Sequence, residues 1–292
     1  MERGFLIHAY NNLEIDYGTM AVCCALLIKK NLRINTTCLV TSPDTLEWIK
    51  HKHGRDLVDR AFDLIKIVDV DRNVATRKFH DTRYSAKEQP YYNTNRADSF
   101  DLSPFDETIL IDSDYLVLDQ NLDNAWGSHD EMMVNRSVRD LSHTHDLLGF
   151  DSRFNDMSIP LYWATVVYFK KTEMVRSIFR MISFIRENYH YYQNLYQFSP
   201  NSYFRNDYAL SIALHMVGGQ IENDSFSTLP TPFLLFSTEH DDMIDFRNGE
   251  AIFISEPTQG RFSLHRVMTS VHVMNKWSIN RISDRIIKHA ID

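Results

Sequence analysis

The stretch DETILIDSDYLVL, residues 106–118, joins an apolar strand to a pair of carboxylates. Residues 108–111 are all apolar or β-branched, which predicts a strand buried within a sheet. Asp112 and Asp114 follow directly, and alternate residues of an extended chain project to the same side. Two facing carboxylates repel each other unless water solvates them or a cation lies between them. The pattern therefore predicts a site for a divalent cation with oxygen ligands, with an ordinary solvated turn as the alternative.

Strand and helix signals alternate on the amino-terminal side of this stretch. The β-forming runs there are residues 5–9, 37–41 and 64–70. Helical spacing covers residues 16–30, and Ser42 followed by Pro43 is a typical helix start. Alternating strands and helices indicate an α/β protein with a central, mostly parallel sheet flanked by helices. Such sheets bind ligands at the carboxyl ends of their strands, where the two aspartates are expected.

The carboxyl-terminal side carries one more strand run and three helical segments. The strand is predicted at residues 162–169, and the helices at residues 172–188, 207–216 and 278–291. After residue 221 short strands and turns replace this pattern. The polar stretch 71–89 predicts a long loop or a lid. No linker or repeat divides the 292 residues, so we expect a single domain over residues 1–292.

Composition narrows the class of protein further. The chain has 39 acidic and 31 basic residues, so its net charge of −8 gives no general attraction to nucleic acid or anionic lipid. Its three cysteines, Cys23, Cys24 and Cys38, fit reduced thiols better than a disulfide framework. The first two lie in a predicted helix and are expected to be buried and unreactive. With no leader-like start and no apolar run of membrane-spanning length, we expect a cytoplasmic protein.

Residues 106–118 resemble the D-x-D motif of glycosyltransferases with the A-type fold (GT-A), in particular the family 8 group that includes glycogenin and bacterial galactosyltransferases. Other stretches carry the resemblance in the expected chain order: IHAYNN at 7–12 with Tyr17 after it, YNTNR at 92–96, YWATVVYF at 162–169, NDYALSIAL at 206–214 and VHVMNKW at 271–277. The resemblance implies a single Rossmann-like GT-A domain. Residues 1–120 would form its nucleotide-sugar-binding half, 121–277 its acceptor and catalytic half, and 278–292 a terminal helix.

The resemblance also implies a reaction and a metal. A sugar would be transferred from a nucleotide-diphosphate sugar to a hydroxyl acceptor such as a glycan or a lipopolysaccharide core. The resemblance also implies that the anomeric configuration of the sugar is retained. The donor would be a uridine one. The metal, Mn²⁺ or Mg²⁺, would be held by Asp112, Asp114 and His272, and an imidazole ligand favours Mn²⁺. Lys276 would place a positive charge on a phosphate oxygen.

Roles for other residues follow from the same resemblance. Asp207 would lie beside the reacting anomeric carbon with Asn206 next to it, and a helix-capping aspartate is the alternative for Asp207. The remaining donor-binding residues implied are Ala9, Tyr10, Asn11, Asn12, Tyr17, Arg96, Asp98 and Ser113. For Arg96 and Asp98 the alternative is a surface ion pair, and for His272 and Lys276 it is ordinary packing or solvation.

Competing functions remain open at this point. One is a phage-type transferase acting on hydroxymethylated DNA bases, whose polyanion groove would be lined by the arginines of 172–188 and by Arg281, Arg285 and Lys288. A second is a nucleotide-sugar-binding protein without activity. A third is a metallohydrolase built from His143, His145 and Asp146 with the acidic pair. A sugar nucleotidyltransferase is disfavoured because residues 8–19 contain only one glycine. His265 competes with His272 as the metal ligand, and nothing indicates the oligomeric state.

Overall fold

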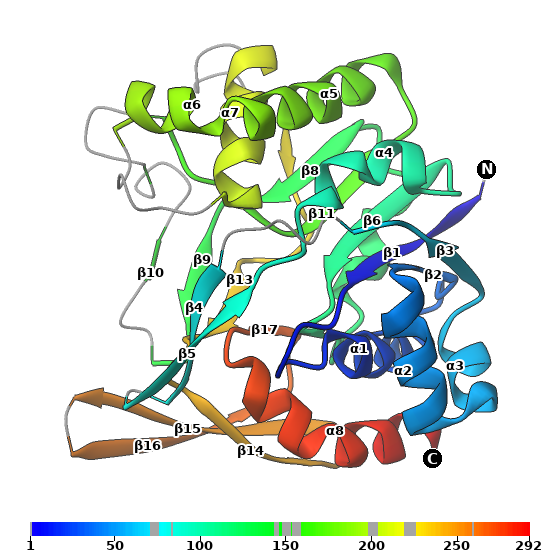
Figure 1. Cartoon of the computed structure of the whole chain (residues 1–292), viewed down its shortest axis with the longest axis vertical. Helices are drawn as coiled ribbons and strands as arrows, with labels where there is room; N and C mark the ends of the chain where they lie inside the picture. The colour runs from blue at the N-terminus through cyan, green and yellow to red at the C-terminus, as the bar shows by residue number, and fades with distance from the viewer. Residues whose placement is uncertain are drawn as a thin grey trace.

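The central element of the protein is a seven-stranded sheet in the order β12-β8-β11-β6-β1-β2-β3 (Figure 1). This computed structural model describes residues 2–70, 76–82, 84–142, 146–147, 153, 159–197, 204–218, 226–258 and 260–292. The strands of the sheet are β1 (Arg3–Ala9), β2 (Thr37–Thr41), β3 (Leu64–Ile67), β6 (Glu107–Asp112), β8 (Met132–Asn135), β11 (Trp163–Lys170) and β12 (Ser227–Thr228). All neighbours pair in parallel except β11, which runs antiparallel to both β6 and β8. The predicted α/β class with a mostly parallel central sheet is confirmed.

Helices cover both faces of this sheet (Figure 1). One hydrophobic cluster joins Phe5 and Ile7 of β1 to the helices α1, α3 and α8, and the other joins Leu6 of the same strand to α5 and α7. Successive side chains of β1 therefore enter opposite layers, as the pleat of a strand requires. The helices are α1 (Tyr17–Asn31), α2 (Pro43–His53), α3 (Arg55–Ala61), α4 (Ser99–Leu102), α5 (Glu173–Glu187), α6 (Tyr189–Leu195), α7 (Asn206–Gly218) and α8 (Lys276–Ile291), with short 3₁₀ turns at Asn95–Asp98 and Asn121–Ala125.

A second sheet extends the first beyond its carboxyl-terminal edge. It has the order β10-β9-β13-β17-β7, and a three-stranded antiparallel sheet, β14-β15-β16, lies between its strands β13 and β17 in the chain. The bounds of these strands are β7 (Tyr115–Leu116), β9 (Val138–Asp140), β10 (Asp146–Leu147), β13 (Leu234–Ser237), β14 (Asp242–Arg247), β15 (Glu250–Thr258), β16 (Arg261–Val267) and β17 (Val271–Val273). The pairing of β17 with β7 brings β17 next to the acidic pair, because β7 begins directly after Asp114.

The prediction of a loop at 71–89 is wrong for the part of this stretch that the structure describes. β4 (Thr76–Thr82) and β5 (Ser85–Pro90) form an antiparallel hairpin. Most of its described side chains are polar and only two are buried, so the alternation that marks a half-buried strand is missing from its sequence. The two buried side chains are Phe79 and Gln89, and Phe79 packs edge-on against Trp277 at the start of α8.

The three cysteines are free thiols, as the sequence predicts. Cys23, Cys24 and Cys38 are free and buried, and burial raises the pKa of the Cys38 thiol to about 11. Cys23 and Cys24 are thus buried as predicted. Among the described residues, no helix is both long and apolar enough to cross a bilayer.

Asp16 fixes the start of α1, and its replacement gives the first testable prediction. Its carboxylate accepts hydrogen bonds from the Thr19 amide at 2.9 Å, from Trp48 Nε1 at 2.8 Å and from Lys52 Nζ at 3.0 Å. Burial alone raises the pKa of Asp16, but these hydrogen bonds outweigh it and lower that pKa below 3.8. We expect Asp16→Ala to reduce the free energy of unfolding by about 1–2 kcal/mol at pH 7.

The pH dependence of this loss follows from the sign of the shift. A depressed carboxyl pKa stabilises the fold above the unfolded value, and this contribution is lost as the pH falls through the folded pKa. Urea unfolding of wild type and Asp16→Ala should therefore differ less at about pH 3 than at pH 7. Glu47→Ala, an exposed residue of the next helix, is the control and should change little at either pH. An equal difference at both pH values would contradict the assigned ionic contribution.

Candidate active site

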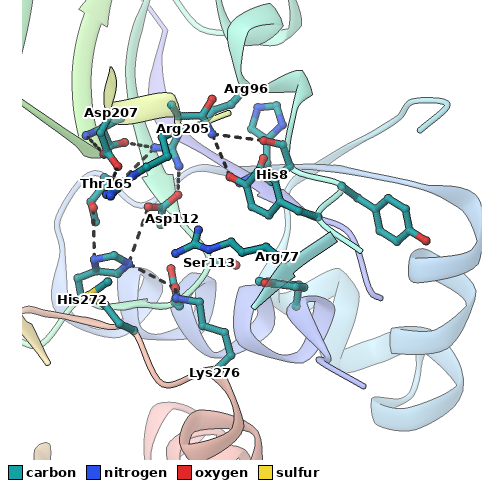
Figure 2. A pocket seen from close by; sticks show the side chains of 18 of the residues that line it. His8, Arg77, Arg96, Asp112, Ser113, Thr165, Arg205, Asp207, His272 and Lys276 are labelled. Carbon is teal, nitrogen blue, oxygen red and sulfur yellow. Dashed lines mark hydrogen bonds and ion pairs between the residues drawn. The ribbon is translucent and has the colours of Figure 1, made fainter. Parts of the chain in front are cut away.

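A pocket opens where β1 and β6 end, close to the amino terminus of the antiparallel strand β11 (Figure 2). It encloses about 870 Å³, its mouth included. Residues far apart in the chain line it, and they are His8, Tyr10, Tyr17, Arg77, Phe79, Tyr91, Tyr92, Asn93, Arg96, Asp112, Ser113, Asp114, Trp163, Ala164, Thr165, Arg205, Asn206, Asp207, His272, Met274 and Lys276. The position agrees with the general rule that ligands bind at the carboxyl ends of parallel strands.

Asp112, Asp114 and His272 converge on one side of this pocket. One ligand atom from each lies within 4.8 Å of the other two. His272 Nε2 is 3.3 Å from Asp114 Oδ2 and 3.9 Å from Asp112 Oδ2, and its other ring nitrogen is 3.4 Å from the Thr165 hydroxyl (Figure 2). Two carboxylates and one oriented imidazole fit a divalent metal ion. Among the described residues, this is the one group of three acidic or histidine side chains with such spacing.

The backbone explains how His272 reaches the acidic pair. β17 pairs with β7 so that His272 lies opposite Tyr115, and the Val273 amide donates to the Asp114 carbonyl at 2.9 Å. The competing residue, His265, lies on β16 and contacts the Ser255 hydroxyl at 2.7 Å. It is not part of the three-residue group, so His272 is the histidine that the fold brings to the two aspartates.

Cationic side chains neutralise both aspartates. The Lys276 ammonium pairs with Asp114, and the Arg96 guanidinium pairs with Asp112. Burial raises the pKa of Asp114, but Lys276 and His272 lower it more strongly, so this pKa ends well below its usual range. Asp114 is therefore ionised and able to act as a ligand at neutral pH. Lys276 is mostly buried here, which differs from the solvated surface lysine that is the common case.

Arg96 is a buried residue rather than half of a surface ion pair. It is 5% exposed, and its guanidinium donates to the Ala164 and Thr165 carbonyls of β11 as well as pairing with Asp112. Burial lowers the pKa of Arg96 to about 10, which leaves it charged at pH 7. Asp98, by contrast, does not line the pocket, and it lies 3.7 Å from Arg186 on the surface. Asp98 therefore forms a surface ion pair, which was the alternative to a role in donor binding.

Asp207 lies in the first turn of α7 and faces the pocket. Its Oδ1 accepts a 2.8 Å hydrogen bond from the Ala164 amide of β11, and its Oδ2 lies 3.1 Å from Arg205. Burial raises the pKa of Asp207, but Arg205 and the Ala164 amide lower it to below its ordinary value. The carboxylate accepts a hydrogen bond from a strand rather than from an amide of its own helix. Asp207 therefore does not act as a helix-capping residue.

Asn206 is held beside Asp207 by its amide nitrogen. Its Nδ2 lies 3.3 Å from both the Tyr91 hydroxyl and the Asn93 carbonyl, which it donates to. Its Oδ1 is buried without a hydrogen-bond partner in the described structure. An unpartnered buried acceptor in a pocket wall is available to a ligand's hydroxyl group.

The remaining predicted donor-binding residues divide into two sets. Tyr10, Tyr17 and Ser113 line the pocket. Ala9, Asn11 and Asn12 do not, and both asparagines are used within the loop that follows β1. Asn11 Oδ1 accepts from the Gly18 amide at 2.7 Å, and Asn12 Oδ1 accepts from the Ile15 amide at 2.8 Å. These hydrogen bonds shape the wall of the pocket and place no side chain inside it.

Several residues of the pocket were not predicted from the sequence. His8 is buried between the Tyr10 and Ser99 hydroxyls, and burial together with Arg96 lowers its pKa to about 3, so it is neutral. Arg205 immediately precedes the Asn206–Asp207 pair, and this adjacency is a signal that could have found it. Trp163 lies in the pocket because β11 begins there. Arg77 lies in the pocket on β4, a strand of the hairpin that the sequence did not predict.

The basic groove expected for a DNA acceptor is not formed. Its arginines lie on α5 and α8, and these two helices lie at opposite ends of the molecule (Figure 1). On α8, Arg281 pairs with Asp81 and Asp242, and Arg285 with Asp245, so their charges are locally compensated. His143 and His145 of the proposed hydrolase cluster, and the side chain of Asp146, lie outside the described residues.

Comparison with known proteins gives distant likenesses. No family model and no curated protein sequence matches the chain. The chain is similar to the glycosyltransferase GlyE of Streptococcus pneumoniae, with 14% identity, a TM-score of 0.43 and coverage of 78% of this chain and 46% of that one. It is similar to the galactosyltransferase LgtC, solved with donor and acceptor sugar analogues, with 14% identity, a TM-score of 0.42 and coverage of 71% and 69%.

A third similar structure is mouse xyloside xylosyltransferase 1, with 11% identity, a TM-score of 0.42 and coverage of 78% of this chain and 85% of that one. The chain thus spans about half the length of GlyE and most of the length of the mouse protein. Likenesses at this distance carry no argument about activity, which has to come from the residues of the pocket.

Proposed function

We propose that this protein is a metal-dependent glycosyltransferase that moves a sugar from a nucleotide-diphosphate sugar, most simply a uridine one, to a hydroxyl group of a glycan acceptor. The observation that carries the proposal is the convergence of Asp112, Asp114 and His272 in a pocket that also holds four cationic side chains. A metal with phosphate-binding cations beside it suits a leaving group that departs as a nucleoside diphosphate.

The charges of the pocket support a polyanionic ligand. Arg96, Arg205 and Lys276 each pair with one of its three aspartates, while Arg77 adds a fourth positive charge. A divalent ion on Asp112 and Asp114 compensates their charge and leaves their cationic partners in excess. Phosphate oxygens would satisfy such an excess, and the role proposed for Lys276, which lines the pocket at the start of α8, is to contact them.

The role proposed for Asp207 is at the reacting carbon of the sugar. Its carboxylate is ionised and is oriented by the Ala164 amide and by Arg205. A fixed negative charge stabilises the positive charge that develops on the sugar ring as the leaving group departs. We propose that the anomeric configuration is retained, either through direct attack by Asp207 or through departure and attack on the same face. Nuclear magnetic resonance of the first product formed identifies its anomer.

Thermal unfolding with nucleotides tests the donor half of the proposal. UDP, GDP, CDP and buffer are each compared with Mn²⁺ and with EDTA, and we expect UDP to raise the melting temperature only when Mn²⁺ is present. At a hundred times its dissociation constant, a ligand adds about 2.7 kcal/mol of stability, which such a scan resolves. The absence of a shift with every nucleotide would contradict the proposal, and an equal shift in EDTA would contradict its metal dependence.

A further inference from the structure

Arg77 differs from the other cations of the pocket in where its partner lies. Arg96, Arg205 and Lys276 pair with aspartates that line the pocket themselves. Arg77 pairs through one nitrogen, at 3.3 Å, with Glu239, which comes from the turn before β14 and does not line the pocket. The positive charge of Arg77 is therefore the one that no carboxylate of the pocket wall balances.

The position of Arg77 directs this charge inward. Its side chain starts on β4 and extends into the pocket toward the side that holds Asp112 and Ser113 (Figure 2). The guanidinium lies against two aromatic rings, with its central carbon 5.2 Å from the centre of Phe79 and 5.7 Å from that of Tyr91. These contacts hold its plane in place while leaving most of its donors unused, because its single hydrogen bond among the described residues is to Glu239.

The hairpin that carries Arg77 contacts the segment that carries His272 and Lys276. Asn275 Nδ2 donates to the Asp81 carbonyl at 2.6 Å, and Asp81 also pairs with Arg281 at 2.6 Å. His272 and Lys276 flank Asn275 in the chain, so β4 and the start of α8 are positioned relative to each other by contacts outside the pocket. Arg77 and Lys276 are therefore carried by elements that contact each other.

We propose that Arg77 is a diphosphate-binding residue: its guanidinium binds the phosphate oxygens of the donor and of the released nucleoside diphosphate. This inference rests on the proposed function. It adds a donor-binding residue from β4, a strand that carries none of the three proposed metal ligands. A planar guanidinium matches two oxygens of a phosphate at once, whereas the Lys276 ammonium acts as a point charge.

Isothermal titration with UDP, UMP and uridine, all in Mn²⁺, tests the assignment. For Arg77→Met we expect UDP to bind about 10- to 100-fold more weakly, because a charged hydrogen bond to phosphate is lost. Uridine lacks phosphate, so its affinity should not change. Arg77→Lys should recover part of the affinity for UDP, and Glu239→Gln should leave it unchanged or increase it because a competing carboxylate is removed.

A control variant and the comparison of UDP with uridine distinguish phosphate binding by Arg77 from a packing role. Arg55→Met, an exposed arginine of α3, is the matched control and should bind UDP as wild type does. If Arg77→Met weakens UDP and uridine equally, Arg77 acts only by packing against Tyr91 and Phe79, and the inference is overturned. If its affinity for UDP equals that of wild type, the inference is likewise overturned while the proposed function stands. Failure of wild type to bind any of the three ligands would instead count against the proposed function.

Discussion

The double variant Asp112→Asn, Asp114→Asn will lose transfer activity by roughly 10³-fold or more, together with its Mn²⁺-dependent stabilisation by UDP. A metal contributes several kcal/mol to stabilising charge on a departing phosphate, and each 1.36 kcal/mol corresponds to tenfold in rate. Asparagine keeps the size of the side chain but removes the negative charge that attracts the ion. The measurements are initial rates with a UDP-sugar and titration of Mn²⁺ in the presence of UDP.

The control for this variant is Asp98→Asn. It changes an aspartate of the nearby surface whose partner is Arg186, and it should leave both the rate and the Mn²⁺ affinity unchanged. The double variant also leaves Lys276 and Arg96 without their carboxylate partners, so its fold must be checked by circular dichroism. A folded double variant that keeps Mn²⁺-dependent binding of UDP would contradict the metal site.

Asp207→Asn will lower the turnover number by about 10²–10³-fold while changing the affinity for UDP little. Removal of one oriented charge at a reacting centre has an effect of this size, and UDP lacks the sugar that Asp207 is proposed to face. The asparagine keeps an oxygen for the Ala164 amide but leaves Arg205 without its anion. We expect about 1–3 kcal/mol less stability, below the loss for a fully buried pair because Arg205 is 34% exposed.

A second substitution separates catalysis from stability in this case. Arg205→Met added to Asp207→Asn removes the uncompensated charge, so urea unfolding should show part of the stability recovered. The turnover number should stay low, because the carboxylate is still missing. Recovery of turnover along with stability would show that Asp207 has only a structural role.

Local patterns were sufficient to predict the acidic pair and five strands of the central sheet, but not β8 and β12. The apolar run of β6 and the spacing of Asp112 and Asp114 are properties of a few adjacent residues, and the strand follows from them directly. The direction of β11 was not predictable in the same way. Its composition is that of any buried strand, and only the pairing of Val166 with Ile111 in the fold makes it antiparallel.

Groups that meet only through tertiary structure were harder to predict. His272 could be linked to the acidic pair only through the family resemblance, because the register of β17 on β7 leaves no trace in the sequence. Arg77 had no signal at all, since the hairpin lacks apolar alternation. The predicted basic groove failed for a related reason: arginines on the polar positions of two helices do not reveal which end of the molecule each helix covers.

The packing of α8 against α1 has a consequence for the synthesis of the protein. Asn280 of α8 receives a 3.0 Å hydrogen bond from the Asp16 amide and donates one to the Asp16 carbonyl, so the last helix closes on the first. On the ribosome, the strands up to β6 emerge well before residues 272–291. A nascent chain that already has Asp112 and Asp114 thus still lacks His272 and Lys276, and the proposed metal site is complete only after the late segment has been translated and has docked.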